Sequence, residues 1–203
     1  MTIFYLIRHG EKEEMIGDAA LSLVGRMQAH VTARHLQHRP INSVYTSPLR
    51  RAEETAVYIA SVHGLPLVED ARLRERANWG DLPGQSFMDF VAMWERSTHD
   101  SEYIPPAGDS ARQAGERMEL FLQETAHKHQ RHEIVVVAHG GIIADFLAHT
   151  IPPEQLEQWH PKFLAMQSRL IPECSITMVR YYGAQFILEQ FARVEHLACL
   201  EEW

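Results

Sequence analysis

The sequence is poor in cysteine and has no long apolar run, and each shortage excludes a class of protein. Its two cysteines, Cys174 and Cys199, form no CxxC pair, which argues against a disulfide scaffold or a cysteine-based zinc site. We expect both to be reduced thiols that serve as small core residues. No apolar stretch approaches the ~20 residues of a membrane span. Residues 1–7 also lack the basic region of a signal peptide, so we expect a cytoplasmic protein without membrane contact.

Positive charge is also scarce. Arginine and lysine number 19 against 27 aspartates and glutamates, which gives a formal net charge of −8. The surface as a whole should therefore repel nucleic acid and anionic membranes, and we expect neither as a partner. Any site for an anion has to be a local concentration of arginine and histidine against this acidic background.

Apolar periodicity predicts strands that alternate with helices. "IFYLI" and "EIVVVA" are typical of buried parallel strands, and helical spacing fills much of the chain between them. Near the C-terminus, two β-like runs separated by Gly183 and Ala184 predict a hairpin. The pattern predicts a single α/β domain over residues 1–203. We expect a three-layer α/β/α sandwich with a mostly parallel central sheet and an antiparallel edge.

The segment 76–108 departs from this pattern. It is rich in glycine and proline around one helical patch, which Ser86 and Asp89 open at capping-box spacing. We expect an insertion that caps a site. Four apolar residues of the patch share a helical face that we expect to pack against the core rather than against a ligand: Phe87, Phe90, Val91 and Trp94.

Two predicted strands end in a histidine followed by glycine. "FYLIRHG" delivers His9, and "VVVAHGG" delivers His139. The carboxyl ends of parallel strands share one rim, where ligands bind in such folds. The helix that opens at Gly140 offers free N–H groups to an anion, and Arg8 and Arg51 add guanidinium groups suited to phosphate oxygens. The residues therefore predict a phosphate pocket.

Six segments, taken in order along the chain, resemble the histidine phosphatase superfamily, also called the phosphoglycerate mutase-like family. They are "RHGE", "LSLVGRMQA", "TSPLRRAEETA", "LRERANWGDLPG", "PPAGDSARQAGERMELFL" and "AHGG". Each segment alone is a weak signal, whereas the ordered set is specific. The resemblance implies a phosphoglycerate mutase-like fold and phosphoryl transfer through a histidine. We expect no cofactor and no metal.

The resemblance also assigns roles to matching residues. His9 takes the position of the histidine that attacks phosphorus and becomes phosphohistidine, so its attacking nitrogen must be unprotonated. His139 takes the position of the histidine that donates hydrogen bonds to the transferred phosphoryl group. Together with His139, the residues expected to bind the substrate are Arg8, Lys12, Arg51 and Gly140.

Two roles, those of the arginine and of the proton donor, each have a second candidate residue. The family's arginine pattern selects Arg51, which leaves Arg50 as a solvent-exposed residue at a helix start. An L-x-E segment makes Glu75 the proton donor to the leaving oxygen. Glu11 adjoins the nucleophile, but the family gives that position a structural role, so we expect the acid to be Glu75.

The residues after the first histidine distinguish hydrolysis from mutase chemistry. Mutases of the family typically read RHGE-[ST]-x-x-N, whereas the same offsets here hold Lys12 and Met15. The stretch between Glu75 and His139 is also short for a mutase. We therefore expect the phosphatase branch, acting on a phosphorylated small molecule or a phosphoprotein. Two alternatives stay open, namely mutase-type phosphoryl transfer and a non-catalytic phosphate-binding module.

A metal enzyme is a further alternative. Two groups of histidines are spaced closely enough for metal ligands. No acidic or cysteine partner stands out, and both groups lie toward the ends of predicted helices, where cationic side chains suit the helix dipole. We therefore expect the histidines of both groups to be surface residues that bind no metal: His30, His35, His38, His127, His129 and His132.

Overall fold

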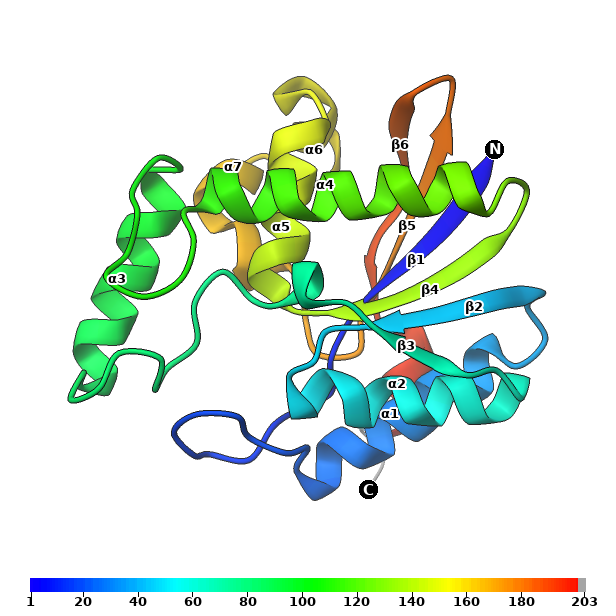
Figure 1. The fold of residues 1–203 in the computed structure, drawn as a ribbon, viewed down its shortest axis with the longest axis horizontal. Helices are drawn as coiled ribbons and strands as arrows, with labels where there is room; N and C mark the ends of the chain where they lie inside the picture. Colours follow the sequence, from blue (N-terminus) through cyan, green and yellow to red (C-terminus); the bar gives the residue numbers. More distant parts are fainter. Residues whose placement is uncertain (201–203) are drawn as a thin grey trace.

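A six-stranded sheet forms the centre of the molecule (Figure 1), and the computed structural model describes residues 1–200. The strand order is β3-β2-β4-β1-β5-β6. The first four strands of this order are parallel, and the last two add antiparallel pairings at one side. The predicted, mostly parallel sheet is thus confirmed. The strands are β1 (Thr2–Arg8), β2 (Ile41–Thr46), β3 (Leu67–Glu69), β4 (Glu133–Ala138), β5 (Ile176–Tyr182) and β6 (Gln185–Arg193).

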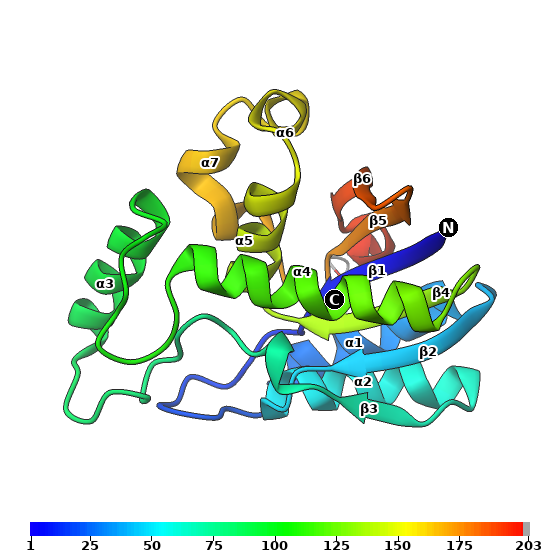
Figure 2. The same cartoon turned by 45° about the horizontal axis from the view of Figure 1, so that its top comes forward.

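Helices cover both faces of the sheet, as predicted for a three-layer fold. One face carries α1 (Leu23–Leu36) and α2 (Arg50–His63), and the other carries α4 (Ala111–Lys128) and α5 (Gly140–Thr150). α3 (Phe87–His99) stands apart, beyond the carboxyl ends of the parallel strands (Figure 2). The short elements are η1 (Ala71–Leu73), α6 (Pro153–Trp159), α7 (Phe163–Met166), η2 (Gln167–Leu170) and η3 (Glu195–Leu200).

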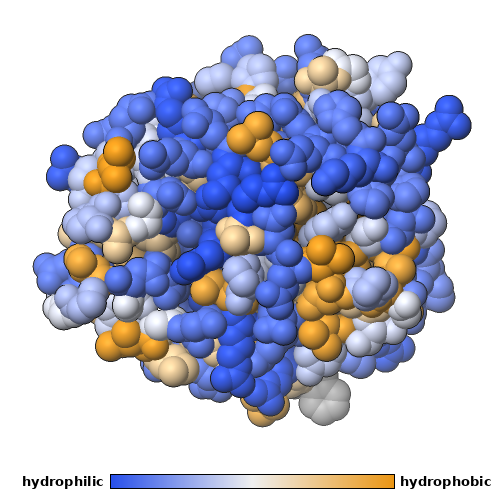
Figure 3. All heavy atoms as spheres, in the orientation of Figure 1, coloured by the Kyte–Doolittle hydropathy of each residue, from blue (hydrophilic) through white to orange (hydrophobic). Residues whose placement is uncertain are grey.

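The central strands are apolar throughout because both of their faces are buried. Along β1, Phe4 and Leu6 pack into the cluster beneath α4 and α5, while Tyr5 and Ile7 pack into the cluster beneath α1 and α2. This alternation follows the two-residue period of a strand. Strand β4 divides its apolar side chains between the two clusters in the same way. On the outside, the face seen in Figure 1 is largely hydrophilic, with apolar side chains in small separate groups (Figure 3).

Local signals set the element ends. Ser22 caps α1 by accepting the Gly25 N–H, and Ser86 caps α3 by accepting the Asp89 N–H. The predicted C-terminal hairpin is present, with Gly183 and Ala184 between β5 and β6 at φ angles of 59° and 65°. Two positive φ values are what a two-residue type I′ turn requires.

The prediction of two core thiols holds for one cysteine only. Cys174 is buried against Leu21 and Ala29, and burial raises the pKa of its thiol to about 12, which makes it unreactive. Cys199 lies in η3, a short turn that contacts α1, and its side chain is exposed. Residues 201–203, which belong to the predicted domain, lie outside the described residues.

Two glycines let the loop after β1 lie directly on the first turn of α1. A Cβ at Gly10 would lie 2.5 Å from the Gly25 carbonyl oxygen, and a Cβ at Gly25 would overlap the Glu11 carbonyl. The same contact carries a hydrogen bond of 2.9 Å from the Ser22 N–H to the Glu11 carbonyl. Backbone packing therefore fixes the position of this loop relative to α1.

Gly25→Ala should lower the free energy of unfolding by about 1–3 kcal/mol, because the new methyl group has no room. An unhindered glycine-to-alanine change inside a helix would instead raise it by roughly 1 kcal/mol, so the sign is diagnostic. Urea denaturation measures the change, with Arg26→Ala at the neighbouring exposed position as the control. A more stable Gly25→Ala protein would contradict the close contact.

Candidate active site

Two histidines leave neighbouring strands at the same level. Arg8 of β1 and Ala138 of β4 are register partners, so the next residues, His9 and His139, emerge side by side. The His9 N–H donates to the Ala138 carbonyl at 3.0 Å. The two rings are buried, with centroids 5.1 Å apart. The structure thus brings together the two histidines that were paired from the sequence.

The surroundings of His9 select one protonation state. Its Nδ1 lies 2.7 Å from the Gly10 carbonyl oxygen, so Nδ1 carries the proton. Its Nε2 accepts a hydrogen bond of 3.1 Å from Nε of Arg51. Burial, followed by the charges of Arg51 and Arg8, holds the pKa of His9 well below its usual value. His9 is therefore neutral with a bare Nε2, the state that a nucleophilic histidine needs.

The first turn of α2 supplies Arg51. One turn later, the Thr55 hydroxyl donates to the Arg51 carbonyl at 2.8 Å and accepts the Gly10 N–H at 3.0 Å. Thr55 therefore joins α2 to the loop that follows His9. The adjacent Arg50 is exposed and donates to Glu54 at 2.7 Å, the surface position that was expected for it.

Three buried nitrogens on residues next to His9 have no hydrogen-bond partner within the described part of the chain. They are Arg8 Nε, Arg51 Nη1 and His139 Nδ1. A buried donor without a partner costs about 1–3 kcal/mol. The Ser47 hydroxyl lies 2.8 Å from His139 Nε2, and a donating hydroxyl leaves the ring proton on Nδ1. This cluster is complementary to an anion that has several acceptor oxygens.

Arg8 and Lys12 complete the cationic side of the site. The remaining guanidinium nitrogens of Arg8 are anchored, one donating to the Ile171 carbonyl at 2.7 Å and another paired with Glu173. Burial, and then the charge of Arg51, lower the pKa of the Lys12 ammonium. Glu173 carries no recognisable sequence pattern and was missed by sequence reasoning.

Glu75 occupies the N-terminus of α5. Its two carboxylate oxygens accept the Gly141 and Ile142 N–H groups at 2.9 and 2.8 Å. These amides were predicted to hold a ligand anion, but the protein's own carboxylate fills that place. Gly141 permits the approach, since a Cβ there would overlap the Glu75 carboxylate and lie 2.6 Å from Cη2 of Trp94. Gly140 is buried at the first position of α5.

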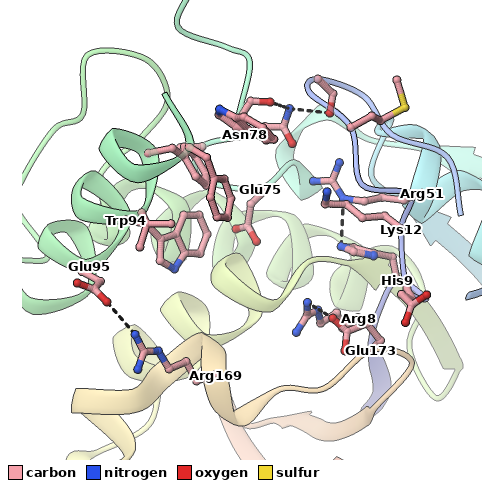
Figure 4. A pocket seen from close by; sticks show the side chains of 18 residues that line it. Arg8, His9, Lys12, Arg51, Glu75, Asn78, Trp94, Glu95, Arg169 and Glu173 are labelled. Atoms are coloured by element: carbon pink, nitrogen blue, oxygen red, sulfur yellow. Dashed lines mark hydrogen bonds and ion pairs between the residues drawn. The ribbon is translucent and has the colours of Figure 1, made fainter. Parts of the chain in front are cut away.

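Glu11, the predicted competitor of Glu75, also lines the cavity, but its carboxylate is engaged by another residue. The Glu11 carboxylate accepts the Ser22 hydroxyl at 2.6 Å, and its backbone N–H donates to the Gln28 side chain at 2.8 Å. Glu11 therefore joins the loop after β1 to the start of α1. Glu75, by contrast, points into the cavity between His9 and Trp94 (Figure 4).

One end of a cavity of about 450 Å³ is lined by Arg8, His9, Lys12, Arg51 and Glu75, and the other by residues of the segment 76–108. Phe87, Phe90, Val91 and Trp94 all face this cavity, which corrects the prediction that they pack against the core. Phe87 is 54% exposed, and the buried residues of α3 are Met93 and Ser97 instead. The helical stripe was identified correctly, but the partner of its apolar face is the cavity.

Contacts on two sides hold the segment 76–108 in place. On one side the Gly17 N–H donates to the Trp79 carbonyl at 2.8 Å, and the Asn78 amide donates to the Gly17 carbonyl at 3.1 Å. On the other side Arg169 of η2 pairs with Glu95 of α3 at 2.8 Å (Figure 4). Arg169 was not found from the sequence, since it lies in a short turn without a pattern.

A buried ion pair lies behind Glu75. Arg76 donates to Asp145 of α5 and to the Thr98 hydroxyl of α3, each at 2.8 Å. The Arg76 guanidinium also lies 3.9 Å from the centroid of the Trp94 ring. Burial raises the pKa of Asp145, while the charge of Arg76 opposes this rise. Arg76, which follows Glu75 in the chain, therefore connects α3 with α5.

The two histidine groups considered as metal ligands lie away from this cavity. Within residues 1–200, no group of three or more histidine, cysteine, aspartate or glutamate residues is arranged to hold a metal ion. His129 lies 3.1 Å from the Tyr45 hydroxyl, and the His35 ring stacks on His196. No helix of the described chain has the length and apolar character that crossing a bilayer demands.

Comparison with known proteins gives the family. The model of the histidine phosphatase superfamily (branch 1) matches residues 4–193. Phosphoglycerate mutase-like protein 4 of Arabidopsis thaliana is 30% identical over 208 residues, which cover 95% of this chain and 85% of that protein. The metal-independent phosphoserine phosphatase of the same plant is 28% identical over 216 residues, covering 98% and 84%. The chain therefore belongs to the histidine phosphatase superfamily.

A solved structure of the same architecture agrees with this assignment. The mycobacterial glucosyl-3-phosphoglycerate phosphatase in complex with inorganic phosphate superimposes with a TM-score of 0.76 at 26% identity. The match covers 97% of this chain and 99% of that one. Together with the family match, this likeness makes the protein an enzyme of the phosphatase class.

His9→Asn should weaken the pH dependence of stability. An unfolded histidine takes up a proton as the pH falls through about 6.5, whereas folded His9 stays neutral to a lower pH. Its contribution to stability is therefore complete above about pH 6.5 and is lost below it, by up to about 1.4 kcal/mol per pH unit. Between about pH 6 and 5, the slope of the unfolding free energy should be smaller in the variant by about that amount.

Urea unfolding in phosphate-free buffer measures both slopes. The control is the same pair of proteins near pH 8, where their difference should not change with pH. Equal slopes in the acid range would contradict a neutral, buried His9.

Proposed function

We propose that the protein is a cytoplasmic phosphomonoester hydrolase that works through a phosphohistidine on His9. The observation that carries the proposal is a neutral His9 beside three unpartnered buried nitrogens, on Arg8, Arg51 and His139. Such an arrangement suits the non-bridging oxygens of a phosphoryl group, whose transfer depends on positioning and charge neutralisation. The two free cysteines suit a reducing compartment.

The reaction has two steps. His9 Nε2 attacks phosphorus, so a P–N bond forms while the ester P–O bond breaks, and Glu75 gives its proton to the leaving oxygen. Water then attacks the phosphohistidine and passes a proton to Glu75, which releases inorganic phosphate and restores bare His9. The first step requires the Glu75 carboxyl in its protonated form. Arg8, Arg51 and His139 hold the phosphoryl oxygens throughout.

Hydrolysis is favoured over mutase transfer by the shape and chemistry of the site. Lys12 and Met15, which replace the mutase pattern, both line the cavity. The proposal takes residues 1–203 as one catalytic domain in which 76–108 caps the cavity. Its substrate is a phosphorylated small molecule, since the phosphoryl site lies at the end of a cavity and His9 is only 6% exposed.

His9→Ala should abolish turnover of p-nitrophenyl phosphate, with kcat reduced at least about 10³-fold, because the nucleophile is gone. The acid-labile phosphoenzyme seen on quenching the wild-type protein with labelled substrate should also disappear. Circular dichroism checks the fold, and His38→Ala, at an exposed histidine, is the matched control. A His9→Ala protein with full activity would refute the phosphohistidine mechanism.

Glu75→Gln should slow alkyl phosphates far more than p-nitrophenyl phosphate. An alkoxide needs a proton to leave, and removal of a general acid costs about 10²–10⁴-fold, whereas p-nitrophenolate leaves without protonation. Single-turnover rates of phosphoenzyme formation measure both effects. Glu11→Gln is the matched control and should change the two rates equally. Equal slowing of both substrates by Glu75→Gln would show that another group is the acid.

A further inference from the structure

The cavity has two chemically different ends. His9, Arg8, Arg51 and Lys12 form the phosphoryl end. Beyond Glu75, the lining is apolar and largely aromatic: Trp79, Phe87, Phe90, Val91 and Trp94. Figure 4 shows Glu75 between His9 on one side and Trp94 on the other. A leaving oxygen that takes its proton from Glu75 would therefore place the rest of its alcohol against this aromatic wall.

The close approach of Trp94 to Glu75 supports this position for the alcohol part of the substrate. A Cβ placed on Gly141 would overlap the Glu75 carboxylate and also lie 2.6 Å from Cη2 of Trp94. The ring edge and the carboxylate are therefore immediate neighbours over the start of α5. Trp94 is in turn held by the guanidinium of Arg76, 3.9 Å from its centroid. The wall next to the leaving oxygen is thus a fixed flat surface.

The charges at this end argue against a second anionic group on the substrate. Of the described cations that line the cavity, Arg8, Lys12 and Arg51 belong to the phosphoryl end. Arg169 is the remaining one, and it is paired with Glu95 at 2.8 Å. With Arg169 held by Glu95, the leaving-group side has no unpaired cation among the described lining residues to receive a substrate carboxylate.

We propose that the preferred substrates are small phosphate monoesters whose alcohol carries an aromatic ring and no second negative charge. This inference rests on the proposed function. The ring lies on Trp94 and Phe90, while the ester oxygen faces Glu75 and the phosphoryl group faces His9. A volume of about 450 Å³ accommodates a phosphoryl group and a ring. Phosphoserine and 3-phosphoglycerate, which carry a carboxylate close to the ester, are poor substrates on this view.

Binding of two non-hydrolysable phosphonates tests the ring preference without turnover. Isothermal titration of the wild-type protein should show benzylphosphonate binding at least about 10-fold more tightly than ethylphosphonate, because the ring is removed from water. Phe90→Ala should reduce this ratio of dissociation constants at least about threefold, and Phe90→Leu, which keeps an apolar side chain, should reduce it less. Met88→Ala is the matched control, since Met88 lies on α3 but is 74% exposed and outside the cavity lining.

Turnover separates this inference from the proposed function. The kcat/KM of benzyl phosphate should exceed those of ethyl phosphate, phosphoserine and 3-phosphoglycerate at least about 10-fold. Equal phosphonate binding, an unchanged ratio in Phe90→Ala, or faster turnover of phosphoserine would overturn the ring preference while leaving a working phosphatase. If none of the four esters is hydrolysed, the proposed function is refuted, and the substrate assignment with it.

Discussion

The parallel pairing of β1 with β4 is the constraint on which the active site depends. With Arg8 opposite Ala138, the two strands end at one level and place His9 and His139 next to each other. Side chains alternate between the faces of a strand, so a slip of one residue would send one ring to the wrong face. The same alternation fills both cores. The packing that stabilises the sheet therefore also fixes the distance between the two histidines.

Around this pair, the protein stores positive charge that its own side chains do not fully neutralise. The chain is acidic overall, with a formal net charge of −8, yet Arg8, Arg51 and Lys12 gather beside His9. The carboxylate of Glu75 is kept apart on the amides that open α5. Charge separation of this kind leaves the cations available to a ligand. Burial, and then the charges of Arg51 and Arg8, keep His9 neutral.

The sequence predicts well what depends on local pattern. The histidines after apolar runs, the serine cap of α3, and the hairpin at Gly183 all follow from neighbouring residues. What it did not predict depends on contacts between distant segments. Helical spacing identifies the face of α3 that carries Phe90, but not whether that face meets a core or a cavity. Likewise, nothing near Glu75 in sequence reveals that its carboxylate lies on the amides of α5, 66 residues away.

Arg76 and Arg169 hold α3 with different strengths. Moving α3 away would remove the Thr98 hydroxyl and the Trp94 ring from the buried Arg76 guanidinium and leave it only Asp145 of these partners. Loss of partners by a buried charge costs up to several kcal/mol. Separating Arg169 from Glu95 breaks only a solvent-exposed pair, which is worth about 0–1 kcal/mol. The attachment of α3 is therefore stronger beside Glu75 than on the side of Arg169.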